Sequence, residues 1–88
     1  AFDELHNILP DTSVIEQYEY EELGKMISVF LSEEKKNMRN VFTRRYFFMD
    51  SIHDIADKYS YSESKVKNML YHTRKKLKVF LEGEGVQI

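Results

Sequence analysis

The chain has no cysteine among its 88 residues, and it has only three glycines and one proline. Without cysteine, neither a disulfide framework nor a cysteine-based zinc site can form. So few glycines argue against a glycine-rich phosphate loop, and no nucleophile elbow is present. No apolar run approaches the roughly 18 residues of a membrane span, and no signal peptide is visible. We therefore expect no enzyme, no cofactor and no membrane segment.

Metal binding is not expected either. His53 and Asp57 stand four residues apart, a spacing at which two side chains on one helix can share an ion. Two ligands without a third make a poor site, so we interpret both as solvated helix residues.

The length fits a single domain, and the chain begins with Ala1 rather than Met, so we expect it to be a fragment of a longer protein.

The charge of the chain is very unevenly distributed. Residues 1–34 hold nine acids and one base, a net charge of −8, whereas residues 35–81 hold twelve Lys/Arg against four acids, a net charge of +8. A basic half of this kind favours a nucleic-acid partner, although the whole chain carries only −2.

The spacing of apolar residues predicts an all-α fold with four helices. Residues 1–12 have no clean period and contain Pro10, and we interpret them as a linker before a helical domain over 13–88. The first helix is expected from 13 to about 31, and the second from a cap at Ser32, with Glu33 and Glu34 in its first turn, to about 49. The third is expected from a cap at Ser51 to 59, and the fourth from a cap at Ser62 to about 82, ending at Gly83. The buried stripe of the second is expected to comprise Met38, Val41, Phe42, Tyr46 and Met49.

The last two of these helices have the pattern of a helix-turn-helix, at about 51–82. Ala56 is small where two helices must approach closely, Ser60 lies four residues later in the turn, and Val66 lies six further on. A glycine would be commoner in that turn. A small residue, a turn residue and a β-branched apolar residue at these separations are what a tight crossing of two helices requires.

The last helix has one apolar and one basic face. Val66, Met69, Leu70, Thr73, Leu77, Phe80 and Leu81 cluster on a helical wheel, and cations and hydrogen-bonding groups lie opposite. We expect base-edge contacts near its N-terminus and phosphate contacts elsewhere. The candidates for bases are Ser64, Lys65, Lys67, Asn68 and Tyr71, and those for phosphates are Arg44, Arg45, His72, Arg74 and Lys75. Ser62 is a further DNA-binding candidate. The plainer interpretation is an amphipathic helix with a solvated basic face.

An aromatic run follows the second basic pair. Tyr46, Phe47 and Phe48 are consecutive, and a helix cannot bury three neighbours on one face. Phe47 and Phe48 either pack against another helix or bind a partner protein. The second alternative follows from the rule that exposed aromatic patches usually have a function.

The segment from Val41 to Gly85 resembles region 4 of bacterial sigma factors of the extracytoplasmic-function group. The motifs are Arg44-Arg45-Tyr46, Ser51 to Ala56, Ser62 to Lys67, and Thr73 to Leu77, in that order. The resemblance covers about residues 20–85. It implies recognition of the promoter minus-35 element on double-stranded DNA and docking on the β-subunit flap of RNA polymerase in the bacterial cytoplasm. It also allows capture by an anti-sigma factor.

Two other functions stay open. The chain could be a stand-alone helix-turn-helix regulator, such as the output domain of a response regulator, which usually binds a two-fold site as a dimer. It could also be a helical protein-interaction module whose basic helix binds an acidic partner.

Overall fold

The computed structural model describes residues 2–5 and 20–85, and over these ranges the chain is helical with no strand. A short 3₁₀ helix and four α-helices follow one another: η1 (Phe2–Leu5), α2 (Tyr20–Ser32), α3 (Lys36–Tyr46), α4 (Ile52–Tyr59) and α5 (Glu63–Gly83). The predicted all-α fold with four α-helices is confirmed.

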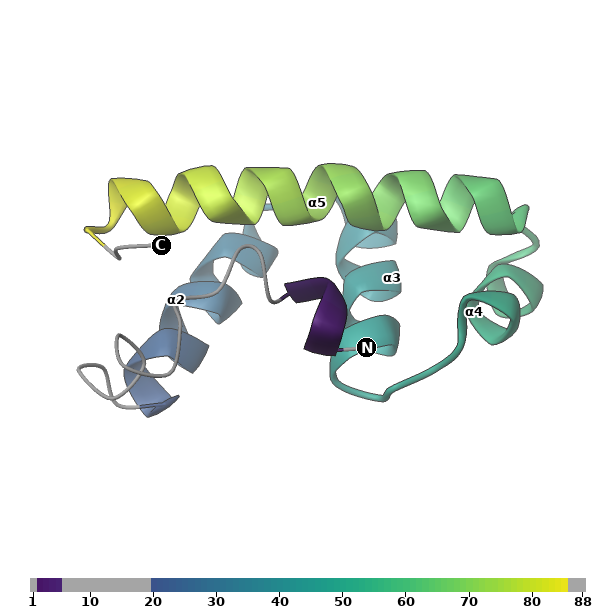
Figure 1. The fold of residues 1–88 in the computed structure, drawn as a ribbon, viewed down its shortest axis with the longest axis horizontal. Coiled ribbons are helices and arrows are strands. Elements are labelled where there is room, and N and C mark those ends of the chain that lie inside the picture. The colour runs from purple at the N-terminus through teal and green to yellow at the C-terminus, as the bar shows by residue number, and fades with distance from the viewer. Residues whose placement is uncertain (1, 6–19, 86–88) are drawn as a thin grey trace.

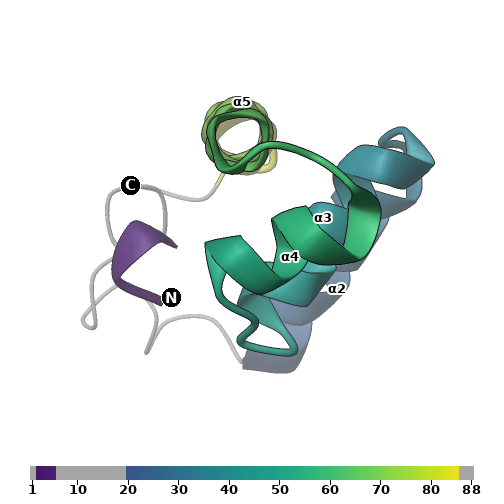
Figure 2. The same cartoon turned by 90° about the vertical axis from the view of Figure 1, so that its right-hand side faces the viewer.

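Helix α5 is the longest element and organises the others. It lies across α2, α3 and α4, which sit side by side along its length (Figure 1). Seen end-on, the three helices occupy one side below α5 and η1 occupies the other (Figure 2). The molecule measures 40 × 24 × 19 Å, with α5 along the longest axis.

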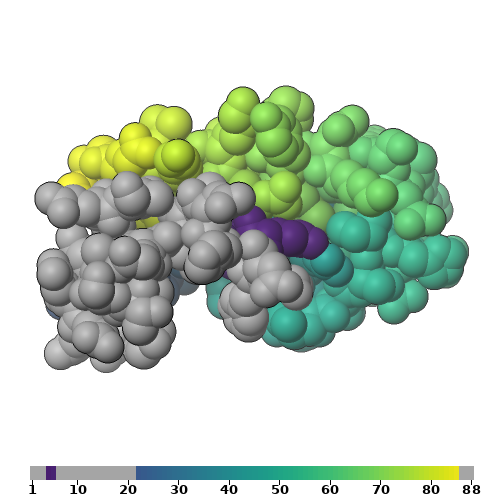
Figure 3. Space-filling view, viewed as in Figure 1, coloured from purple at the N-terminus to yellow at the C-terminus, as the bar shows by residue number. Residues whose placement is uncertain are grey.

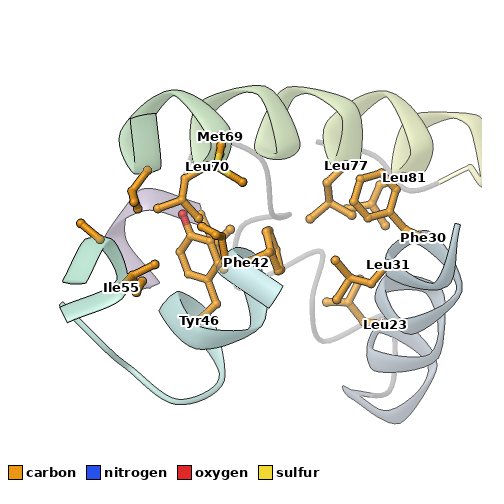
Figure 4. Packing of buried hydrophobic residues seen from close by; sticks show 14 residues of the cluster. Leu23, Phe30, Leu31, Phe42, Tyr46, Ile55, Met69, Leu70, Leu77 and Leu81 are labelled. Carbon is orange, nitrogen blue, oxygen red and sulfur yellow. The ribbon is translucent and has the colours of Figure 1, made fainter. Parts of the chain in front are cut away.

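The core consists of two groups of side chains that α5 joins. One group, at the N-terminal half of α5, includes Phe42, Tyr46, Ile55, Met69 and Leu70 (Figure 4). The other, against α2, includes Leu23, Phe30, Leu31, Leu77 and Leu81. Because one helix contributes to both groups, removing its apolar face would separate α2 from the rest of the core.

The turn between α4 and α5 forms as the sequence predicts. The Ser51 and Ser62 hydroxyls accept hydrogen bonds from the backbone N–H groups of Asp54 (3.0 Å) and Lys65 (3.1 Å), so both predicted N-caps are confirmed. Ser60 is in the left-handed conformation, with φ 58° and ψ 39°.

Two backbone bonds close the C-terminus of α4 around that residue. The Tyr61 N–H donates to the Ala56 carbonyl (2.9 Å) and the Ser60 N–H donates to the Asp57 carbonyl (3.4 Å), which is the Schellman pattern. Ala56 and Val66 are both buried, as their spacing predicts.

The start of the second predicted helix is wrong. Ser32 is the last residue of α2 and its hydroxyl donates to the Val29 carbonyl (2.7 Å), so it does not cap α3. Glu33 and Glu34 continue the end of α2 through their N–H groups, and α3 begins only at Lys36. The first residues predicted for the first helix, 13–19, lie outside the described ranges.

The end of the second predicted helix also differs from the prediction. Helix α3 ends at Tyr46, and Met49, predicted to be buried, is in a positive-φ conformation (60°) with 51% of its surface exposed. That backbone conformation turns the chain toward α4 and directs Met49 away from the core. At the other end of the domain, α5 ends at Gly83, as predicted, and the glycine with positive φ (86°) is Gly85.

The predicted linker contains an ordered, packed segment. Residues 2–5 form η1, and Leu5 is only 5% exposed and belongs to the core. Residues 6–12 of the predicted linker lie outside the described ranges.

Candidate nucleic-acid interface

One face of α5 is polar, cationic and open to solvent. Its back is closed by Val66, Met69, Leu70, Thr73 and Leu77, all buried. Thr73, the single polar residue among them, satisfies its hydroxyl by donating to the Met69 carbonyl (2.8 Å). The side chains that the sequence assigns to the front are all exposed: Ser64, Lys65, Lys67, Asn68, Tyr71, His72 and Lys75.

Aromatic rings position some of these cations without burying them. The Lys65 ammonium lies 4.1 Å from the centroid of the Tyr61 ring, and the Lys75 ammonium lies 5.0 Å from that of Tyr71. Such contacts favour particular rotamers by about 0.5–1 kcal/mol at exposed sites. The ammonium groups stay at the surface and remain available to an anion.

The turn end of the face is more acidic. A shallow hollow there is lined by His53, Asp57, Glu63 and residues 60–62. The His53 Nδ1 lies 3.8 Å from a carboxylate oxygen of Glu63. Within the described ranges no three histidine or acidic side chains gather as metal ligands would. The cationic part of the face therefore begins at Lys65.

The three arginines predicted to contact phosphate are placed differently from the lysines. Arg44 donates through Nε to Asp50 (2.7 Å), and its guanidinium stacks on the Phe48 ring at 4.4 Å. Its side chain is about one-third exposed. It is thus held beside the loop after α3, already partnered with a carboxylate.

Arg45 and Arg74 converge on one carboxylate, that of Glu4. Arg45 forms an ion pair with Glu4 through Nη2, donates through Nε at 3.2 Å, and donates through Nη1 to the Asp50 carbonyl at 2.9 Å. The Arg74 Nη1 lies 3.5 Å from the other Glu4 oxygen. Both arginine side chains are partly buried, with exposed fractions of 18% and 21%.

The Tyr46 hydroxyl hydrogen-bonds both to the Glu4 carboxylate and to Arg74. It donates to Glu4 Oε2 (2.8 Å) and accepts from Arg74 Nη1 (2.9 Å). We refer to Glu4, Arg45, Tyr46 and Arg74 as the Glu4 cluster. It joins η1, α3 and α5 through hydrogen bonds, so it serves as a polar counterpart to the apolar core.

The protonation states in the cluster follow from these contacts. Burial alone would raise the pKa of Glu4, but hydrogen bonds from Arg45 and Tyr46, together with the charges of both arginines, outweigh it and lower that pKa. Burial raises the pKa of Tyr46 to about 12. The hydrogen bond to Glu4 raises the pKa of Arg45. At neutral pH the Glu4 carboxylate is therefore ionised and the Tyr46 phenol is neutral.

A groove connects the Glu4 cluster to the exposed face of α5. It is lined by Glu4, Ile52, Lys67, Asn68, Leu70, Tyr71 and Arg74. Three candidate base readers, Lys67, Asn68 and Tyr71, thus share a depression with an acidic residue. On the face shown in Figure 3, the purple atoms of residues 4–5 lie directly beneath the green surface of α5 and beside the teal surface.

The part that Glu4 takes in this site is not predicted by the sequence. Glu4 is 41 residues from Arg45 and 70 from Arg74, and nothing in the local pattern links them. The excess of acids in residues 1–34 was the only available signal.

Phe47 and Phe48 do not pack into the core. They are 62% and 60% exposed, and with Met49 they form a solvent-facing apolar loop between α3 and α4. Phe47 also borders a shallow hollow with Leu31, Arg39 and Thr43.

Comparison of the chain with protein-family models, with curated proteins and with solved structures finds no match. In the part of the chain that the structure describes, none of the helices combines the length and apolar character needed to cross a bilayer.

Proposed function

We propose that this chain is the promoter-reading domain of a bacterial sigma factor, similar to region 4, and that it recognises the minus-35 element as part of RNA polymerase. In this proposal α4, the turn and α5 are a helix-turn-helix, and α5 enters the major groove. The observation that carries it is the division of α5 into a buried apolar back and an exposed front with Lys65, Lys67, Asn68 and Lys75.

The dimensions and chemistry of that front suit DNA. An α-helix with its side chains is about 10–12 Å across, and the major groove is about 12 Å wide. Lysine neutralises phosphates and releases their counterions, and Asn68 carries an amide that can pair with adenine through two hydrogen bonds. Tyr71 adds an exposed ring between these groups.

The exposed loop after α3 supports the polymerase part of the proposal. Phe47 and Phe48 together offer two rings to a partner, and aromatic side chains are common among the residues that dominate protein interfaces. A partner bound to Phe47 and Phe48 would leave the exposed front of α5 free, so one domain could bind DNA and a protein together.

Duplex titration tests the DNA part of the proposal. Binding is measured by fluorescence anisotropy at two salt concentrations, on a duplex selected from a random pool and on random DNA. Asn68→Ala should cost about 1–3 kcal/mol on the selected duplex and less on random DNA. Lys75→Ala should weaken both alike and reduce the salt slope by roughly one.

Lys76→Ala provides a matched control for Lys75→Ala. It removes the same charge from the next position of α5, where the ammonium lies 3.5 Å from a carboxylate oxygen of Glu34, just after α2. We expect it to leave DNA binding almost unchanged. Equal losses from Lys75→Ala and Lys76→Ala would mean that DNA senses only net charge, and this would contradict a binding face.

Capture of the polymerase β flap tests the second part. Phe47→Ala and Phe48→Ala should weaken capture without changing DNA affinity, and Val79→Ala, which trims another exposed apolar side chain, is the control. DNA binding without flap capture would favour a stand-alone regulator. Binding to an acidic protein but not to DNA would favour an interaction module.

A further inference from the structure

The segment Phe2–Leu5 is held to the domain at two points. Leu5 is 5% exposed within the core, and Glu4 bonds to Arg45, Tyr46 and Arg74. One attachment is apolar and the other is ionic. Because the apolar and the ionic attachment are adjacent, this short helix can dock in one specific position.

The place where this segment docks is close to the proposed DNA face. Glu4 lines the same groove as Lys67, Asn68 and Tyr71. Its carboxylate engages Arg74 of α5, which the sequence assigns to phosphate, and also Arg45. Carboxylate and phosphate oxygens are recognised by guanidinium groups through the same charge-assisted hydrogen bonds. Glu4 thus occupies the donors that a phosphate would use.

We propose that Phe2–Leu5 is an intramolecular latch, in which Glu4 takes the place of a DNA phosphate on Arg45 and Arg74 and so competes with duplex DNA for the domain. This inference rests on the proposed DNA-binding function. In the closed state the latch hides two cations and places a negative charge beside the base-reading side chains. Release of the latch exposes both guanidinium groups and removes the repulsion toward an incoming phosphate.

The closed fraction sets the size of the effect. The apparent dissociation constant for DNA equals the intrinsic one divided by the fraction of open molecules, so any change that opens the latch strengthens binding. Opening costs the buried contacts of Leu5 as well as the Glu4 bonds. The two anchors can therefore be weakened separately.

Glu4→Gln in the full chain tests the ionic anchor. It keeps the shape of the side chain and removes its charge, and we expect the affinity for duplex DNA at low salt to rise about 3–10-fold while the melting temperature falls. Glu22→Gln is the matched control, because it removes the same charge from an exposed position of α2. It should change affinity much less.

Leu5→Ala tests the apolar anchor without changing charge. It should raise DNA affinity in the same direction as Glu4→Gln, which simple charge removal cannot explain. Amide hydrogen exchange of residues 2–5, measured with and without duplex DNA in the wild-type chain, provides a readout that needs no variant. Exchange should accelerate when DNA binds.

The outcomes separate the latch from the proposed function. If the wild-type chain binds DNA through Lys75 but Glu4→Gln binds no tighter than Glu22→Gln, the latch is refuted and the DNA-binding domain stands. A lower melting temperature with unchanged affinity would likewise make the Glu4 cluster purely structural. If neither the wild-type chain nor Glu4→Gln binds duplex DNA, both the latch and the proposed function fail.

Discussion

Replacing Ser60 with glycine should make the domain more stable. Ser60 is held at φ 58° and ψ 39° by the backbone bonds that close α4. For a residue with a Cβ atom, this left-handed conformation costs roughly 1–2 kcal/mol, whereas glycine adopts it freely. The Ser60 side chain is exposed, so its removal takes nothing from the core.

The expected gain is the difference between two effects. Relief of the left-handed strain is offset by about 0.4–1 kcal/mol, because glycine gives the unfolded chain more conformations to lose. Ser60→Gly should therefore raise the free energy of unfolding by about 0.5–1 kcal/mol. For a domain of this size, that corresponds to an increase in melting temperature of about 2–8 °C.

Thermal and urea denaturation followed by circular dichroism measure the effect. Ser60→Ala keeps the Cβ atom and should bring no gain. Ser60→Val should destabilise the domain, because β-branched residues are outliers at positive φ. If Ser60→Gly proved no more stable than the wild-type chain while Ser60→Val was tolerated, the turn would not impose a left-handed residue, and the account of the α4–α5 crossing would be wrong.

Three further predictions concern other parts of the domain. Gly24→Ala should stabilise it by about 1 kcal/mol in urea denaturation, because a Cβ atom at this exposed position in α2 would meet no heavy atom within 4 Å; a loss of stability would contradict this. Leu77→Ala should cost about 2–5 kcal/mol, since Leu77 is fully buried (0% exposed), and a cost below 1 kcal/mol would contradict its place in the core. The bonds of Glu4 should stabilise the domain fully above its ordinary pKa of 4.5 and lose their effect as the pH falls through its lowered folded pKa. The difference in melting temperature between wild type and Glu4→Gln should therefore be constant above about pH 5 and disappear in more acidic buffer; a difference that persisted there would show that ionisation is not its source.

Local chemistry made much of the fold predictable. Ser51 and Ser62 were recognised as caps because a hydroxyl needs only the N–H three residues later, and both bonds form. The buried face of α5 was predicted because helical periodicity alone determines which residues share a side. The same periodicity predicted an exposed front with Lys65, Lys67 and Asn68, and the structure places these side chains in solvent.

The predictions that are wrong concern helix ends that backbone geometry determines. The apolar pattern predicts that Met49 belongs to the buried stripe. The positive φ at Met49 interrupts that pattern, and this position holds neither glycine nor asparagine, which would indicate a positive φ. The sequence predicts a cap at Ser32 because Ser32 and the two acids that follow it form a typical start signal. The hydrogen bonds of Glu33 and Glu34 to α2 outcompeted it.

The sequence by itself determined the four α-helices, the turn around Ser60 and the amphipathic division of α5, because each depends on residues within a few positions of one another. Only the tertiary structure decided which cations are available. It leaves Lys65, Lys67 and Lys75 exposed, and it pairs Arg45 and Arg74 with Glu4, from which they are separated by 41 and 70 residues. Charge composition cannot distinguish these two groups, because an ion pair depends on distance in space and the packing of η1 against α3 and α5 sets that distance.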